Sequence, residues 1–115
     1  MVGGVLDPGG VLAVLGMFLL TTAFYAATAH VAARYVLGDV PVTAALLVGP
    51  VPALAMVALL QVNLVLAIVV AVVADFVAIK FAYDIRKGLA AIVTVVHYAV
   101  SALSVFVIAS IAASI

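Results

Sequence analysis

The segment from Val40 to Ile79 constrains the fold most, because Asp75 is its single charged residue. As one helix, its 40 residues would be about 60 Å long, twice the ~30 Å hydrocarbon core of a bilayer. The segment therefore predicts two membrane crossings joined by a turn. The composition agrees, since 71% of the chain is hydrophobic and 7% is charged, against about 45–50% and about 25% in soluble domains. Such a chain could not cover its surface with polar groups, so we expect lipid as its solvent.

The turn inside this segment has two candidate positions, Gly49–Pro52 and Gln61–Asn63. A turn at Gly49 would leave one piece too short to span a bilayer and the next too long, whereas Gln61–Asn63 gives two nearly equal spans. We therefore expect the turn at Gln61–Asn63, and a kink or break in the second helix at Gly49, Pro50 and Pro52, since proline lacks a backbone donor. This break is either a plain kink, as is common in membrane helices, or part of a transport site.

Polar breaks divide the whole chain into four apolar segments, with no repeat, linker or low-complexity region between them. The sequence thus predicts an all-α fold: a single transmembrane domain over residues 1–115, built as an integral membrane four-helix bundle with short loops. The expected helices cover about residues 11–33, 42–60, 62–83 and 89–111.

The basic residues predict the orientation. Four spans place Arg34, Lys80, Arg86 and Lys87 on one side of the membrane, with no Lys or Arg on the other. The positive-inside rule assigns that side to the cytoplasm. We therefore expect a multi-pass protein of the cell membrane with both termini outside.

Asp75 and His97 form the candidate intramembrane polar pair. Asp75 lies eleven residues before Arg86 in the last turn, and His97 lies eleven after it. Antiparallel helices would bring the two side chains to the same depth, near the bilayer midplane. A lone charge there costs about 2.5–3.5 kcal/mol on the most lenient scale, and an imidazole opposite would reduce this cost. Lys80 is a poorer partner, since it is rotated about 140° from Asp75 and can reach the membrane surface.

Small and hydroxylated residues recur at helical spacing on the first and last helices, and such faces allow membrane helices to approach closely. The stripe on the first helix contains Thr21, Tyr25, Thr28 and Ala32. From these faces we take Thr94, Ser101, Thr21 and Tyr25 as candidate supporting residues. The polar group is open to two interpretations: hydrogen bonds that hold helices together, or part of a proton or cation pathway.

The sequence gives little support to catalysis or cofactor binding. It has no cysteine and a net charge of zero, and it lacks nucleophile-elbow, zinc-protease and phosphate-loop motifs. The Asp–His pair and nearby serines have the residue types of a hydrolytic triad, but they would lie in lipid without evident access for water. We therefore expect no enzyme, no metal, no cofactor and no nucleic-acid partner.

The segment "DFVAIKFAYDIRKGLAAIVTVVHYAV" resembles the last helical hairpin of Yip1-type membrane proteins. The shared features are Tyr83 near the helix end, a short basic turn, and Gly88-Leu89 at the start of the last helix. That family commonly has five spans whereas we expect four here, so the resemblance implies no trafficking function. The Ala/Val-rich composition also resembles small uncharacterised membrane proteins of halophilic archaea, which implies no activity.

Two functions remain as hypotheses. The first is a structural or accessory subunit of a membrane complex or homo-oligomer, with the lipid bilayer and other membrane subunits or further copies as partners. The alternative is a small proton- or cation-coupled transporter or channel that uses Asp75 and His97.

Overall fold

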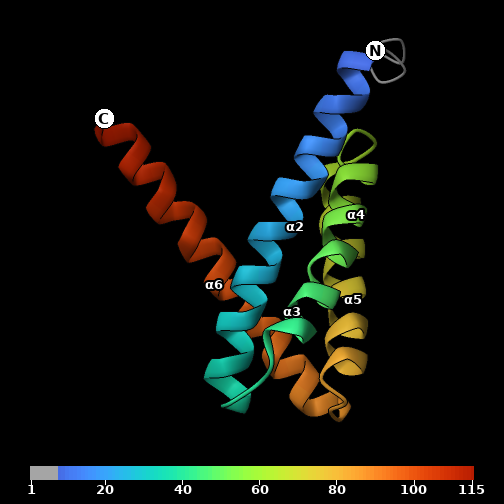
Figure 1. Cartoon of the computed structure of the whole chain (residues 1–115), viewed down its shortest axis with the longest axis vertical. Helices are drawn as coiled ribbons and strands as arrows, with labels where there is room; N and C mark the ends of the chain where they lie inside the picture. The colour runs from blue at the N-terminus through green and yellow to red at the C-terminus, as the bar shows by residue number, and fades with distance from the viewer. Residues whose placement is uncertain (1–7) are drawn as a thin grey trace.

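The computed structural model describes residues 8–115 as helices joined by short turns (Figure 1). In chain order these are α2 (Pro8–Leu37), α3 (Val42–Val48), α4 (Pro50–Leu59), α5 (Leu64–Ala82) and α6 (Lys87–Ser114). Because α3 and α4 are two halves of one broken helix, the described residues contain four helices that are long and apolar enough to cross a membrane. The predicted all-α bundle of four helices is confirmed.

The chain runs back and forth between the two ends of the bundle (Figure 1). The start of α2, the turn between α4 and α5, and the end of α6 lie towards one end. The link from α2 to α3 and the turn from α5 to α6 lie at the other. This second end carries the basic residues, because Arg34 and Lys80 are in the last turns of their helices, Arg86 is the N-cap of α6 and Lys87 is its first residue.

The break in the second helix lies at Gly49, as predicted. Its N–H donates to the carbonyl of Ala45 at 2.9 Å, but Pro50 and Pro52 have no N–H to continue the ladder. A Cβ atom on Gly49 would lie 2.7 Å from the carbonyl oxygen of Thr22 and 2.9 Å from the Cβ of Ala26. Glycine therefore allows the broken helix to pack directly against the backbone of α2.

The turn between the second and third spans lies at Leu60–Asn63, which confirms the choice of Gln61–Asn63 over Gly49. Asn63 is the N-cap of α5, and its side chain accepts a hydrogen bond from the N–H of Leu66 at 3.0 Å. A side-chain acceptor at this position satisfies a backbone donor that has no partner within the helix. The same residue therefore ends the turn and starts α5.

Two helices extend beyond the expected ranges. The helix α2 continues to Leu37 rather than ending near Ala33, and Gly38, with φ of 90°, follows it. The N–H of Gly38 donates to the carbonyl of Arg34 at 3.1 Å, as in helices that end in a left-handed glycine. With 30 residues in α2 and 28 in α6, these helices are about 45 Å and 42 Å long. Both are longer than the ~30 Å that a helix needs to cross a hydrocarbon core.

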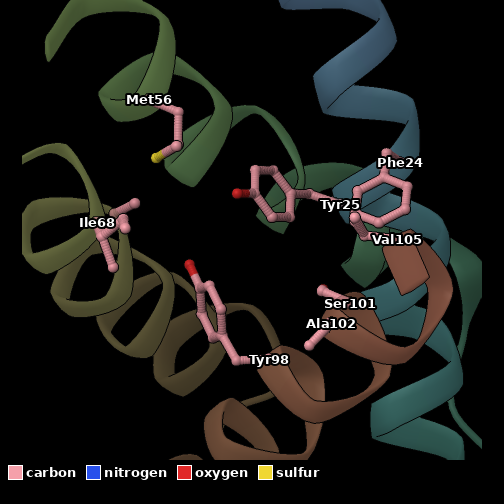
Figure 2. Close-up of a pocket in the computed structure, with 9 residues that line it drawn as sticks. Phe24, Tyr25, Met56, Ile68, Tyr98, Ser101, Ala102 and Val105 are labelled. Atoms are coloured by element: carbon pink, nitrogen blue, oxygen red, sulfur yellow. The ribbon is translucent and has the colours of Figure 1, made fainter. Parts of the chain in front are cut away.

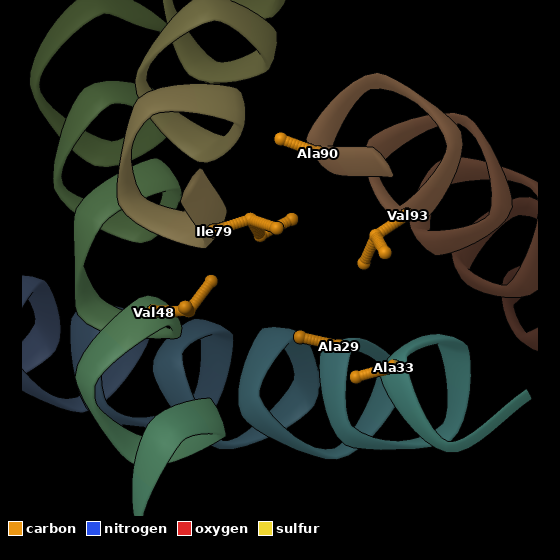
Figure 3. Close-up of a cluster of buried hydrophobic side chains, with 6 residues drawn as sticks. All are labelled: Ala29, Ala33, Val48, Ile79, Ala90 and Val93. Carbon is orange, nitrogen blue, oxygen red and sulfur yellow. The ribbon is translucent and has the colours of Figure 1, made fainter. Parts of the chain in front are cut away.

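Small residues make the core, and most large apolar side chains face outward. The main buried cluster joins α2, α3, α5 and α6 (Figure 3). It consists of Ala29, Ala33, Val48, Ile79, Ala90 and Val93. Alanine at these positions lets the helices approach closely, as membrane helices commonly do.

The two halves of α6 differ in their surroundings. Its first half packs into the bundle through buried residues that include Val93 and His97. From Ala102 to Ile115 every residue except Ser104 is exposed. This second half leans away from α2 and leaves an open angle between the two helices (Figure 1).

Candidate functional site

Asp75 on α5 and His97 on α6 meet inside the bundle. Their side chains are fully buried, and Nδ1 of His97 lies 2.5 Å from Oδ2 of Asp75. Both residues lie eleven positions from Arg86 in the sequence, which predicted that they would pair. The structure brings them together. Lys80 does not join them, and its Nζ lies 4.9 Å from the centroid of the Phe81 ring.

Thr28 on α2 binds the other side of the histidine ring. Its Oγ1 lies 2.8 Å from Nε2 of His97, and it is also 3.0 Å from the carbonyl oxygen of Phe24 and 3.2 Å from that of Tyr25. A threonine hydroxyl has one proton to donate. If that proton goes to a backbone carbonyl, the Nε2–H of His97 donates to Thr28 and every group in this contact is satisfied.

If Nε2 carries its proton in this way, the net charge of the group follows. With a proton on Nε2, one further proton is shared between Nδ1 and Asp75. The pair is then either a carboxylate with an imidazolium or a neutral acid with a neutral imidazole, and its net charge is zero in both cases. A lone carboxylate at this place would be far more costly to bury than such a pair.

Ser101 extends the hydrogen bonds towards the bundle surface. Its Oγ has one proton, which it can donate either to the carbonyl of His97 at 2.8 Å or to Oγ1 of Thr28 at 3.2 Å. We call Asp75, His97, Thr28 and Ser101 the polar cluster. The cluster connects three helices, because Thr28 lies on α2, Asp75 on α5, and the other two residues on α6.

The other candidate residues lie around this cluster or apart from it. Tyr25 is buried with its ring edge-on to His97, at 5.7 Å between centroids. Thr21 is partly buried and lines cavities beside Tyr25. Thr94 is buried but donates within its own helix, to the carbonyl of Ala90 at 2.7 Å. The break at Gly49, Pro50 and Pro52 makes no side-chain hydrogen bond to the cluster and packs against α2 instead.

Two residues that lie near Asp75 and His97, Thr28 and Tyr98, were not predicted from the sequence to belong to the site. Thr28 was part of the predicted stripe on the first helix, one turn from Tyr25, and this was the signal that could have found it. Tyr98 follows His97 directly, and its ring centroid lies 5.3 Å from that of the histidine. Nothing in the sequence indicated that its side chain would turn towards α2 and α5.

A cavity of about 400 Å³ adjoins the polar cluster (Figure 2). It lies between α2, α4, α5 and α6, and its walls are almost entirely apolar. Ser101 forms part of the wall, so the hydrogen-bond chain from Asp75 ends at the cavity. The lining residues are Phe24, Tyr25, Met56, Ile68, Ala71, Tyr98, Ser101, Ala102 and Val105.

Asp75, His97 and Thr28 lie in the order of acid, base and hydroxyl that a hydrolytic triad has. Thr28 lies within the long helix α2, and backbone N–H groups inside a helix bond to carbonyls one turn earlier. No free N–H therefore points at the position where an oxyanion would form. This arrangement suits hydrogen bonding between helices, or passage of a proton, better than acyl transfer. Among residues 8–115, no three His, Cys, Asp or Glu side chains come close enough to hold a metal ion.

Fold and site together define a bundle of four apolar helices that are tied at one level by a buried polar cluster. The chain belongs to a family of unknown function, DUF7473, whose model matches residues 8–115. No curated protein and no solved structure shows a significant match to the chain.

Proposed function

We propose that this chain is a small integral membrane protein that acts as a structural or accessory subunit of a membrane complex or homo-oligomer. The observation that carries the proposal is the second half of α6, where every residue from Ala102 to Ile115 except Ser104 is exposed. Helix association in a bilayer depends on close packing between helices. A long helical segment with little intramolecular packing is therefore available for packing against another subunit.

The polar cluster supports this role by fixing where α6 leaves the bundle. His97 and Ser101 bond α6 to α2 and α5, and the exposed half of the helix begins directly after Ser101. The cluster thus holds one end of α6 at a defined position and leaves the other end projecting. A partner helix would meet a preformed surface, which lowers the entropic cost of association.

We further propose that the basic end of the bundle faces the cytoplasm and that both termini lie outside. Arg34, Lys80, Arg86 and Lys87 at one end support this orientation through the positive-inside rule. The resemblance of the C-terminal hairpin to Yip1-type proteins, and of the composition to small membrane proteins of halophilic archaea, is compatible with this proposal and rests on sequence alone.

Site-directed cross-linking tests the subunit role, because the chain has no cysteine of its own. Phe106→Cys places a thiol on the projecting half of α6, and Val69→Cys places one on the outer face of α5; the native residues are 69% and 53% exposed. In native membranes at low expression, a short bifunctional thiol reagent should give a defined larger product from Phe106→Cys and much less from Val69→Cys. Gentle extraction should give a particle larger than one chain. A monomeric particle, with equal cross-linking at both positions, would contradict the proposal.

The second candidate function is a proton or cation pathway, and the hydrogen-bond chain from Asp75 to the cavity wall favours it. In addition, Oδ1 of Asp75 is buried without a partner among residues 8–115, and ionisable groups inside membranes often belong to such pathways. The full burial of both Asp75 and His97 favours the structural role in this conformation.

Proton movement into proteoliposomes, followed with a trapped pH-sensitive dye, tests this second candidate. If it holds, Asp75→Asn should abolish a flux that the exposed matched control Asp39→Asn retains. Equal behaviour of the native protein, both variants and empty liposomes would exclude proton transport.

A further inference from the structure

Another cavity, of about 460 Å³, lies between α2 and α3, which run side by side towards the basic end of the bundle (Figure 1). Two small buried side chains, those of Ala26 and Ala45, form its floor. Val31, Val42 and Leu46 are each more than half exposed, so the cavity is open on the outside of the bundle. We call it the α2–α3 groove, and its remaining lining residues are Ala23, Ala27 and His30.

The polar groups of the α2–α3 groove lie at one end. His30 is the single lining residue whose side chain carries a polar atom. Its Nδ1 is buried, so the ring can donate to a molecule in the groove through Nε2 only. Arg34 follows His30 by four residues, which places it on the same face of α2 and about 6 Å nearer the basic end. The groove is therefore apolar along its length, with an imidazole and then a guanidinium at its end.

The charge of Arg34 is not matched within the described part of the chain. Its side chain is exposed, and the one ion pair among residues 8–115 joins Asp75 to His97. Asp39, in the link between α2 and α3, therefore does not pair with it. The basic end as a whole has four basic residues against two acidic ones, Asp39 and Asp84. This end of the groove thus favours an anion over a neutral or cationic group.

From the apolar groove and its charged end we propose that the α2–α3 groove binds an anionic phospholipid. One acyl chain lies along the alanine floor, and the phosphate meets the guanidinium of Arg34, which suits phosphate oxygens. One turn deeper, a glycerol oxygen accepts a hydrogen bond from Nε2 of His30. The site rests on the proposed insertion into a membrane. It does not rest on the proposed subunit role, because one chain forms all of its walls.

Fluorescence quenching tests the site, because the chain has no tryptophan of its own. Leu46→Trp places a fluorophore at the rim of the groove, and Leu103→Trp places one on the projecting half of α6; the native residues are 58% and 64% exposed. The whole protein is reconstituted into vesicles of phosphatidylcholine and phosphatidylglycerol, with quenching bromine atoms on the acyl chains of only one of the two lipids. At Leu46→Trp, phosphatidylglycerol should bind about 5-fold more tightly than phosphatidylcholine, as expected for one basic residue near an anionic headgroup. At Leu103→Trp the two lipids should quench equally, which establishes insertion independently of the groove.

Variants made in the Leu46→Trp protein separate the groove from a general attraction of the basic end for anionic lipid. Arg34→Gln should abolish the 5-fold preference, whereas Lys87→Gln should keep most of it, because it removes the same charge from a helix that does not line the groove. Ala27→Leu fills the groove from an exposed position and should also abolish the preference. Ala91→Leu, at an exposed position on α6, is its matched control and should change nothing.

Three outcomes would overturn the site. Equal quenching by the two lipids at Leu46→Trp, with Leu103→Trp still quenched, would refute the groove and leave the proposed insertion standing. Equal losses from Arg34→Gln and Lys87→Gln would assign the preference to the basic end as a whole. Absence of quenching at both tryptophans would contradict the groove and the insertion together.

Discussion

The hydroxyl oxygen of Thr28 lies 2.8 Å from Nε2 of His97, so α2 binds the far side of the same imidazole ring that Asp75 binds from α5. One histidine side chain therefore links three helices. Because both ring nitrogens are engaged, the position of His97 depends on two partners that are far apart in the chain. Loss of either partner should affect the whole bundle rather than one helix pair.

Thr28→Val should destabilise the protein more than Thr28→Ser. Valine has nearly the shape of threonine but leaves Nε2 of His97 without a partner inside the bundle, so we expect a loss of about 1–2 kcal/mol in the free energy of unfolding. Serine keeps the hydroxyl and should cost less than half as much. Reversible unfolding in mixed micelles measures both. Thr43→Val, at an exposed position on α3, should change stability little, and a loss there equal to that of Thr28→Val would refute the importance of the hydroxyl.

Asp75 and His97 should be strongly coupled in a double-mutant cycle. His97→Leu removes the partner of the buried Asp75, and Asp75→Leu removes the partner of Nδ1 of His97, with an expected loss of about 3–5 kcal/mol for each. The double variant should recover part of this loss, so the coupling should exceed the ~0.6 kcal/mol average of interhelical hydrogen bonds in membranes. Asp75→Asn should be milder than Asp75→Leu, since the amide can still bond to the ring. Strictly additive losses would mean that the two residues act independently.

The pairing of Asp75 with His97 could be predicted because it follows from local rules. A short turn between antiparallel helices fixes which residues share a depth, and the small residues at three- and four-residue spacing fix which face points inward. The break at Gly49 could be predicted for a similar reason, since two prolines interrupt any helix. These features depend on one helix or on one hairpin.

The role of Thr28 and the divergence of α6 could not be predicted, because both depend on how α2 is placed against the hairpin. More than 40 residues separate Thr28 from Asp75 and from His97, and no turn geometry connects their depths. Ser104 follows Ser101 at the three-residue spacing of a helix face, yet the helix has already begun to leave the bundle at that point. A periodic pattern shows which face is suited to packing, but it does not show how far along the helix a neighbour is present.

Single-cysteine labelling should show the basic end of the bundle inside the cell. A membrane-impermeant thiol reagent applied to intact cells should label Gln61→Cys, in the turn between α4 and α5, and Ser114→Cys at the end of α6. It should spare Gly88→Cys beside the turn between α5 and α6, until the cells are opened. The reverse pattern would invert the orientation. Labelling of Gly88→Cys together with only one of the other two positions would be incompatible with four spans.

Gly49→Ala should be destabilising although alanine favours helices. The added Cβ would lie 2.7 Å from the carbonyl oxygen of Thr22 and 2.9 Å from the Cβ of Ala26, distances at which the two helices must move apart. We expect a loss of about 1–3 kcal/mol in the free energy of unfolding, as for other overpacked contacts.

Gly16→Ala is the matched control, because Gly16 also lies in a helix but nothing stands within 4 Å of its added Cβ. There the same substitution should be neutral, or should stabilise by up to about 1 kcal/mol through helix propensity. Both variants are compared by unfolding in the same micelles. Equal effects would show that the break serves only to bend the helix, whereas opposite signs would establish Gly49 as the contact point between the broken helix and α2.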